Sequence, residues 1–137
     1  MDENELTKIY LKRLEHKDTV TGRLSESTRY LAFGIVAWVF ALHASDSQFS
    51  SDLVETYKPT LGIAAFFAAS AITLDYFQYL SAYVSVRHAI SRPEQEYKYD
   101  KRYLAYRIQN FCFIVKQVLV GLSSIIVTTV FALQVGR

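Results

Sequence analysis

Two charged residues stand inside otherwise apolar stretches of the sequence. Asp75 follows LGIAAFFAASAITL, and Lys116 interrupts FCFIVKQVLVGLSSIIVTTVFALQV. A charged side chain at membrane depth costs about 2.5 to 3.5 kcal/mol on insertion scales, so each should face protein or water and have a partner. On antiparallel neighbouring helices the two residues would lie at similar depth. The pair is expected either to lock a helical hairpin as a structural ion pair or to form a gate in a permeation path.

Each charge lies in or beside a helical face of small and polar side chains. Steps of three and four residues give one face with Ala64, Ala68, Ala71, Asp75, Gln78 and Ala82. The second run carries a comparable face with Asn110, Gln117, Gly121, Ser124 and Thr128. Such faces either pack helices closely in lipid or line a water-filled path built from several copies. The candidates for a pore or gate are Asp75, Gln78, Lys116, Gln117, Ser124 and Thr128.

The sequence contains no recognisable catalytic or metal-binding pattern. It has no Gly-rich phosphate loop, no Ser-His-acid set and no His-Glu metal spacing, and its three His are scattered. The single Cys112 excludes an intrachain disulfide and lies in FCFIV, where a buried and inert thiol is expected. We therefore expect a protein that is not an enzyme and that uses neither a cofactor nor a metal.

The distribution of charge sets the expected fold. The 137 residues are 51% hydrophobic, and charges gather before residue 30 and between residues 87 and 107. That segregation predicts an all-α integral membrane protein with three transmembrane helices at about 29–45, 59–86 and 108–135. A cytoplasmic amphipathic helix in 1–28, ended by Gly22, is expected to precede this transmembrane domain of 29–137. Pro59 is expected in the first turn of the second span.

Orientation follows from the basic residues. All of the 15 Lys and Arg except Lys58 and Arg137 precede the first expected span or lie from residue 87 to residue 116. The positive-inside rule then places the N-terminus in the cytoplasm and the C-terminus outside, with an outer loop at 45–58. Five tyrosines are expected at the inner boundary, namely Tyr30, Tyr79, Tyr83, Tyr103 and Tyr106.

The second and third helices are expected to be longer than the bilayer is thick. They should extend into a cytoplasmic hairpin at 87–107, whose turn is SRPEQEYKYD. Its basic side chains are candidates for contact with anionic lipid headgroups or with an anionic ligand. These are Arg87, Arg92, Lys98, Lys101, Arg102 and Arg107.

The layout of the whole chain resembles a group of small bacterial membrane proteins. LTKIYLKRLEHK would be the leading helix, ALHASDSQFSSDLVETYKP the outer loop and VRHAISRPEQEYKYDKRYLAYR the inner turn. This arrangement is similar to SLATT-like proteins and to the transmembrane effector of Hailong-type anti-phage defence. The resemblance implies a homo-oligomer, taken here as a tetramer, in the bacterial inner membrane. It also implies gating by a nucleotide or oligonucleotide, a cytoplasmic nucleotidyltransferase partner and loss of the membrane potential on opening.

The sequence is also compatible with a second class of function, that of an accessory membrane subunit. Three spans in one chain cannot enclose a water-filled path, so conduction would require several copies. A small protein with polar helix faces could instead be an accessory subunit that binds a larger membrane partner and does not conduct. Liposome conduction and the number of copies in detergent separate these two classes.

Overall fold

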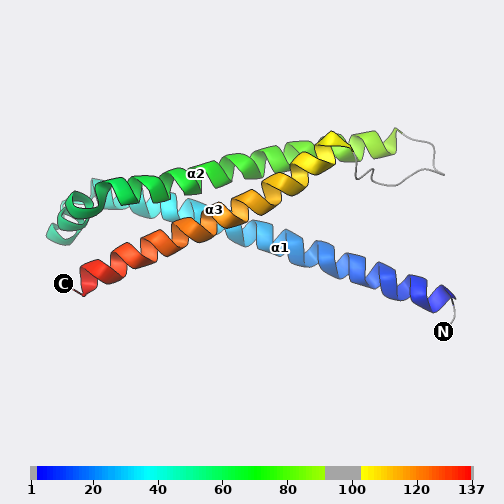
Figure 1. Ribbon diagram of the computed structural model, residues 1–137, viewed down its shortest axis with the longest axis horizontal. Coiled ribbons are helices and arrows are strands. Elements are labelled where there is room, and N and C mark those ends of the chain that lie inside the picture. Colours follow the sequence, from blue (N-terminus) through cyan, green and yellow to red (C-terminus); the bar gives the residue numbers. More distant parts are fainter. Residues whose placement is uncertain (1–2, 92–102, 137) are drawn as a thin grey trace.

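The computed structural model describes residues 3–91 and 103–136, and this part of the chain is entirely helical. Its helices are α1 (Glu3–Ala44), α2 (Gln48–Ile90) and α3 (Leu104–Val135). Figure 1 shows α2 and α3 running side by side in opposite directions, with the N-terminal half of α1 diverging from them. Each helix contacts the other two, and α2 packs most extensively against α3. The all-α prediction is confirmed for the described residues.

The first helix differs from its prediction. Gly22 was expected to end a separate amphipathic helix, but it lies inside α1, which runs without a break for 42 residues. A single glycine costs about 1 kcal/mol in a helix, and the helix on both sides of it outweighs that cost. Beyond Gly22 a buried face begins, with members spaced by three or four residues: Ser25, Thr28, Ala32, Ile35, Val39 and Leu42.

The expected outer loop is also mostly helical. Only residues 45–47 separate α1 from α2. The last of them, Ser47, is the N-cap of α2. The Ser50 backbone N–H donates to the Ser47 hydroxyl at 3.2 Å, which satisfies one of the free donors of the first turn. The helix then bends at Tyr57, whose φ of −119° and ψ of 18° are not helical. Pro59 lies two residues later and removes one backbone hydrogen bond, which accounts for the bend.

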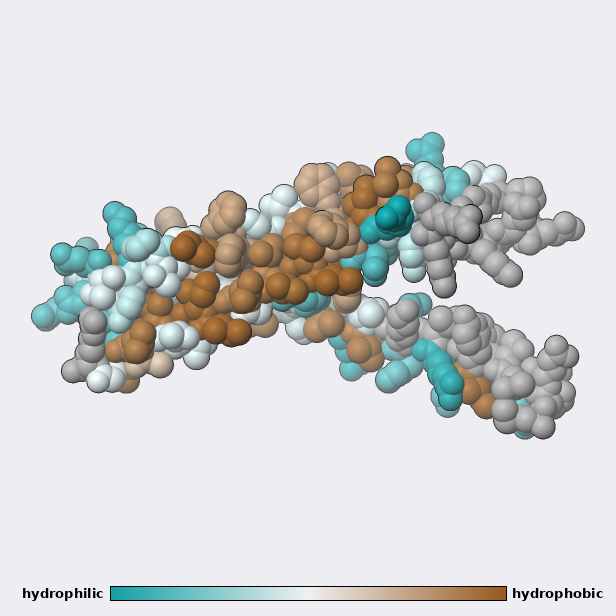
Figure 2. Space-filling view, viewed as in Figure 1, coloured by the Kyte–Doolittle hydropathy of each residue, from teal (hydrophilic) through white to brown (hydrophobic). Residues whose placement is uncertain are grey.

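Two of the helices are long and apolar enough to cross a membrane. These are α2 over Gln48–His88 and α3 over Leu104–Val135. At 1.5 Å per residue the 32 residues of α3 extend about 48 Å, against a hydrocarbon core of about 30 Å. On the face drawn in Figure 2 the apolar side chains form a band along the middle of the molecule, with hydrophilic residues toward both ends. The expected first span at 29–45 lies in α1 and stays a prediction.

The core is a seam of small and branched side chains between the helices. In α2 the expected small-residue face is buried, with Ala64 and Ala68 at 0% exposure and Ala71 at 2%. Leu53 and Leu61 continue it toward the start of that helix. Without a hydrophobic drive between helices in lipid, small residues favour contact by allowing the backbones to approach. At the other end, the rings of His88 and Tyr103 stack with centroids 4.1 Å apart, joining the end of α2 to the start of α3.

Candidate functional site

A buried cluster of charges joins all three helices. The Asp75 carboxylate of α2 accepts a hydrogen bond from Arg29 Nε of α1 at 2.7 Å. Its other oxygen forms an ion pair with Lys116 Nζ of α3. Lys116 also donates to the hydroxyl of Ser25, which in turn lies 3.3 Å from the same Asp75 oxygen. The expected pairing of Asp75 with Lys116 is therefore present, and α1 adds two further members.

The ion pair at the centre of this cluster is buried, and the charges of the cluster are unequal in number. The Lys116 side chain is 1% exposed, and that of Asp75 is 9% exposed. Charges removed from water are tolerated only when they are paired and hydrogen-bonded, and here the carboxylate meets both requirements. Two cations nevertheless face one carboxylate, because Arg29 and Lys116 both pair with Asp75. The cluster therefore carries an excess of positive charge close to the point where α1 diverges.

Aromatic rings surround the two cations. Arg29 Nη2 donates to the Tyr79 hydroxyl at 2.8 Å, and the guanidinium lies 5.1 Å from the centre of the same ring. Lys116 Nζ lies 5.7 Å from the centre of the Phe113 ring. The negative face of an aromatic ring attracts a cation, most strongly where water is excluded. These rings therefore help to hold both cations in place.

Two further polar contacts tie the helices together on the outer side of the cluster. Thr28 of α1 donates a hydrogen bond to the side-chain carbonyl of Gln117 in α3. Ser123 of α3 donates to the backbone carbonyl of Ala64 in α2 at 2.7 Å. An interhelical hydrogen bond in a membrane contributes about 0.6 kcal/mol on average, so these contacts set the register more than the stability.

Of the remaining pore candidates of α3, Gln117 contacts α1, Ser124 is half-buried and Thr128 lies outside the seam. Its buried residues are Cys112, Lys116, Val120, Ser123 and Val130. Gly121 and Thr128 are exposed, while Gln117 and Ser124 are half-buried. The hydroxyls of Ser124 and Thr128 donate to backbone carbonyls four residues earlier in their own helix. The predicted polar face of α3 thus points largely away from the bundle, whereas that of α2 lies inside it.

The basic residues of the expected hairpin divide into two groups. Arg87 and Arg107 are exposed, on the last turn of α2 and the first turn of α3. Arg92, Lys98, Lys101 and Arg102 lie outside the described residues. Contact of these side chains with lipid or with an anionic ligand stays a prediction. Within the described ranges, no group of three His, Cys, Asp or Glu is placed to hold a metal ion.

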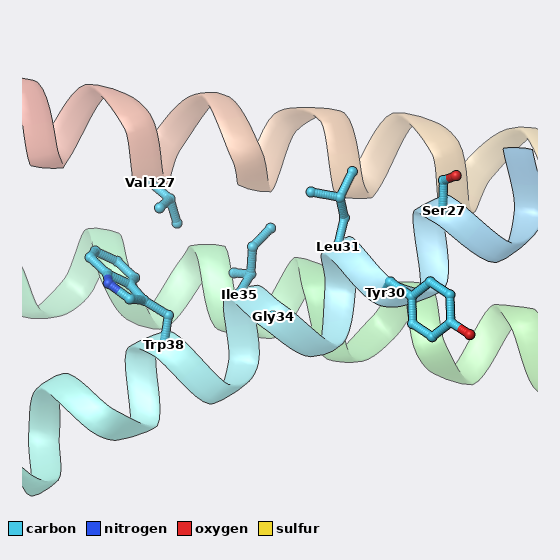
Figure 3. A pocket seen from close by; sticks show the side chains of 7 residues that line it. All are labelled: Ser27, Tyr30, Leu31, Gly34, Ile35, Trp38 and Val127. Atoms are coloured by element: carbon cyan, nitrogen blue, oxygen red, sulfur yellow. The ribbon is translucent and has the colours of Figure 1, made fainter.

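An apolar groove separates α1 from α3 on the outer side of the charge cluster. It has a volume of about 520 Å³. Figure 3 shows Leu31, Ile35 and Trp38 of α1 extending toward Val127 of α3. Its remaining lining residues are Ser27, Tyr30 and Gly34. A side chain added at Gly34 would meet no atom within 4 Å, so the groove is open at this point.

The sequence and the fold were compared with known proteins. No protein family, no curated protein and no solved structure matches the sequence or the fold. What the described residues define is an all-helical fold with two helices long and apolar enough to cross a membrane and a charge cluster between the helices.

Proposed function

We propose that this chain is a subunit of an oligomeric membrane pore that disrupts the membrane potential when it opens. The observation that carries the proposal is the position of the polar face of α3. Gly121 and Thr128 lie on the outer surface of the bundle, although their helix is apolar enough to span a membrane. Polar positions on a membrane helix tend to face protein or water. Several copies arranged around an axis would turn this face toward a shared path.

The groove between α1 and α3 supports the assembly of copies. Val127 lines it, and Thr128 is the next residue along α3, so the groove runs beside the polar face. A helix of a neighbouring copy seated along Gly34 would cover apolar surface, while the polar face would remain turned to the axis. We take a tetramer as the working copy number.

The charge cluster is placed to act as the lock of this pore. Lys116 and Gln117 are consecutive residues, and both bond to α1, through Ser25 and Thr28 respectively. A displacement of α1 would therefore reach Gln117, the first of the candidate lining residues on α3. In this scheme Asp75 and Lys116 hold the closed state, Gln78 lies one turn further along the same face of α2, and Ser124 and Thr128 line the path.

The trigger in this proposal follows from the resemblance to anti-phage effectors. A nucleotide or oligonucleotide signal, made by a cytoplasmic nucleotidyltransferase, would act on the basic ends of α2 and α3. Arg87 and Arg107 are exposed there and carry charge of the required sign. The bacterial inner membrane, with the N-terminus in the cytoplasm, is the proposed location.

Cysteine accessibility in liposomes tests the lining directly. Thr128 and Thr129 are adjacent, both are exposed, and both donate to a carbonyl four residues earlier, but they lie on faces about 100° apart. We expect a charged thiol reagent added from water to block ion flux through Thr128→Cys and to leave Thr129→Cys unaffected. Cys112 is buried and serves as the internal background. Equal modification of the two variants, or block of neither, would refute the lining.

One observation favours an accessory subunit instead. The charge cluster is satisfied within a single chain and needs no second copy. An accessory subunit would use the outer face of α3 to bind a larger membrane protein and would conduct nothing. A chain that gives no dye-detected ion flux in liposomes and has the mass of one copy in mild detergent would establish this alternative.

A further inference from the structure

A polar cavity lies where α1 separates from the other two helices, beside the charge cluster. It has a volume of about 370 Å³ and is lined by residues of all three helices. Asp18, Gly22 and Ser25 contribute from α1, and Gln78 and Tyr79 from α2. Cavities of about 300 to 1,000 Å³ with a few convergent polar groups are typical of small-ligand sites. The groups at its two ends indicate which ligand it takes.

One acceptor beside the cavity calls for a donor of hydrogen bonds. Gln78 Oε1 is buried and accepts no hydrogen bond from any described residue. A buried acceptor left without a donor loses free energy that a ligand N–H group would restore. Asp18 is the only carboxylate among the described residues that line the cavity, and these residues include no Lys, Arg or His. A primary ammonium group meets both requirements, since it carries positive charge and three N–H donors.

The end of the cavity beside the charge cluster is electropositive, in contrast to the end beside Asp18. Ser25 and Tyr79 line it there, and each accepts a hydrogen bond from a cation of the cluster, from Lys116 and Arg29 respectively. Among the described residues, the carboxylate of Asp75 is paired with both of these cations. Because Tyr79 accepts from Arg29, its own hydroxyl proton is available to donate into the cavity. An anionic oxygen is favoured at this end.

The order of these charges matches a phospholipid that enters from the membrane. Asp18 precedes Ser25 by seven residues, so the two ends are about 10 Å apart along α1. The cationic end lies toward the apolar part of the helices, and Asp18 lies toward the N-terminal half, in which every described side chain before Thr21 is exposed. In a phospholipid with an amine in its headgroup, the phosphate likewise lies nearer the acyl chains and the amine nearer water.

We infer that this cavity binds the headgroup of a phospholipid that carries a primary amine, with its ammonium toward Asp18 and its phosphate toward Ser25 and Tyr79. The inference rests on the membrane orientation in the proposed function and is independent of conduction. Phosphatidylethanolamine has both groups. Phosphatidylcholine has a cation without N–H donors, and phosphatidylglycerol has no cation, so these two lipids separate the contributions of charge and hydrogen bonding.

Native mass spectrometry of the full chain tests the inference. The protein would be released from nanodiscs containing equal parts of the three lipids, and the retained lipids counted. Gly22→Leu fills the cavity, since a side chain there meets no atom within 4 Å. Gly62→Leu, an exposed glycine of α2 with equal free space, is the matched control. We expect wild type and Gly62→Leu to retain phosphatidylethanolamine selectively, and Gly22→Leu and Asp18→Asn to retain about tenfold less.

Each result has a defined meaning. Equal retention of the three lipids, or full retention by Gly22→Leu, would overturn the inference. Soluble phosphoethanolamine that displaces the lipid would show that the headgroup alone is recognised. If soluble phosphoethanolamine binds but the lipid is not retained, the site serves a free metabolite and the lipid assignment is wrong. Retention does not depend on ion flux, so a chain that is silent in liposomes but selective for this lipid refutes the pore and leaves the site standing.

Discussion

The polar faces of α2 and α3 look alike in the sequence but lie in opposite surroundings. On α2, Ala64, Ala68 and Asp75 are buried against the other helices of the same chain. On α3, Gly121 and Thr128 lie on the outer surface, and the buried positions come one residue earlier in the sequence. Small and polar residues at helical spacing therefore identify a face but not its partner. One face holds the subunit together, and the other is left for a neighbour.

The largest effect is expected from the charge at the centre of the α2 face. Asp75→Ala leaves Lys116 buried without a counter-charge and Arg29, which is partly exposed, without its partner, and breaking a buried pair in this way costs about 3 to 5 kcal/mol. Unfolding in mixed micelles, followed by circular dichroism, measures the loss. Asp52→Ala, at an exposed position of the same helix, is the control and should change little. A loss below about 1 kcal/mol for Asp75→Ala would show that the cluster does not hold the bundle.

A smaller effect is expected where the α2 face contacts its neighbours without charge. Ala68 is 0% exposed, so Ala68→Leu forces a larger side chain into a filled seam. Overpacking of this kind costs about 1 to 3 kcal/mol. The same unfolding measurement applies, with Ala69→Leu at the next, exposed position as control. Equal stability of the two variants would mean that the seam is not packed as described.

Two adjacent serines of α3 separate the inner face from the outer face more finely. Ser123 donates to the Ala64 carbonyl across the helix contact, whereas Ser124 donates to Val120 within its own helix. We expect Ser123→Ala to cost about 0.6 kcal/mol and Ser124→Ala to cost less, because only the first removes an interhelical bond. A careful comparison of unfolding midpoints resolves this difference. The reverse order would contradict the assignment of the two faces.

No loss of stability is expected at the centre of the α3 face. A side chain at Gly121 meets no atom within 4 Å, so Gly121→Leu should not destabilise the single chain, and the replacement of a helical glycine should stabilise it by up to about 1 kcal/mol. The oligomeric state should nevertheless change, because the added side chain protrudes toward the proposed axis, where the polar faces of the copies come together. Native mass spectrometry of wild type and variant gives the copy number. An unaltered assembly would remove this face from the interface.

The sequence predicted the helical class and the central ion pair because both follow from local rules. Asp75 and Lys116 could be paired by depth alone, since each is a charge within a long apolar run. The prediction of which face of α3 contacts the other helices was less accurate. Gln117 and Lys116 are neighbours about 100° apart on a helix, so the face centred on Gln117 differs from the face centred on Lys116. Choosing the face that contains the partner of Asp75 would have led to Val120 and Ser123, which are buried.

The contribution of α1 was missed for a different reason. Arg29 was counted among the flanking positive charges, and Gly22 was taken as a helix end, so Ser25 had no expected role. The signal was present in the spacing of three and four residues from Ser25 through Ala32 to Leu42, which is continuous across the expected boundary. Which of several polar residues meets Asp75 depends on how helices cross. That is a tertiary property, and local periodicity does not contain it.

The unbroken course of α1 has a mechanical consequence. A rod of 42 residues is about 63 Å long, and its polar attachment at Ser25 and Arg29 lies near its midpoint. Beyond this attachment, the face from Ala32 to Leu42 is packed into the bundle, so the N-terminal arm is a lever with the attachment as its pivot. A force that tilts the N-terminal arm would strain the packing of the segment around Trp38. A push from the aqueous side would in this way be felt at the far surface without any unfolding between the two.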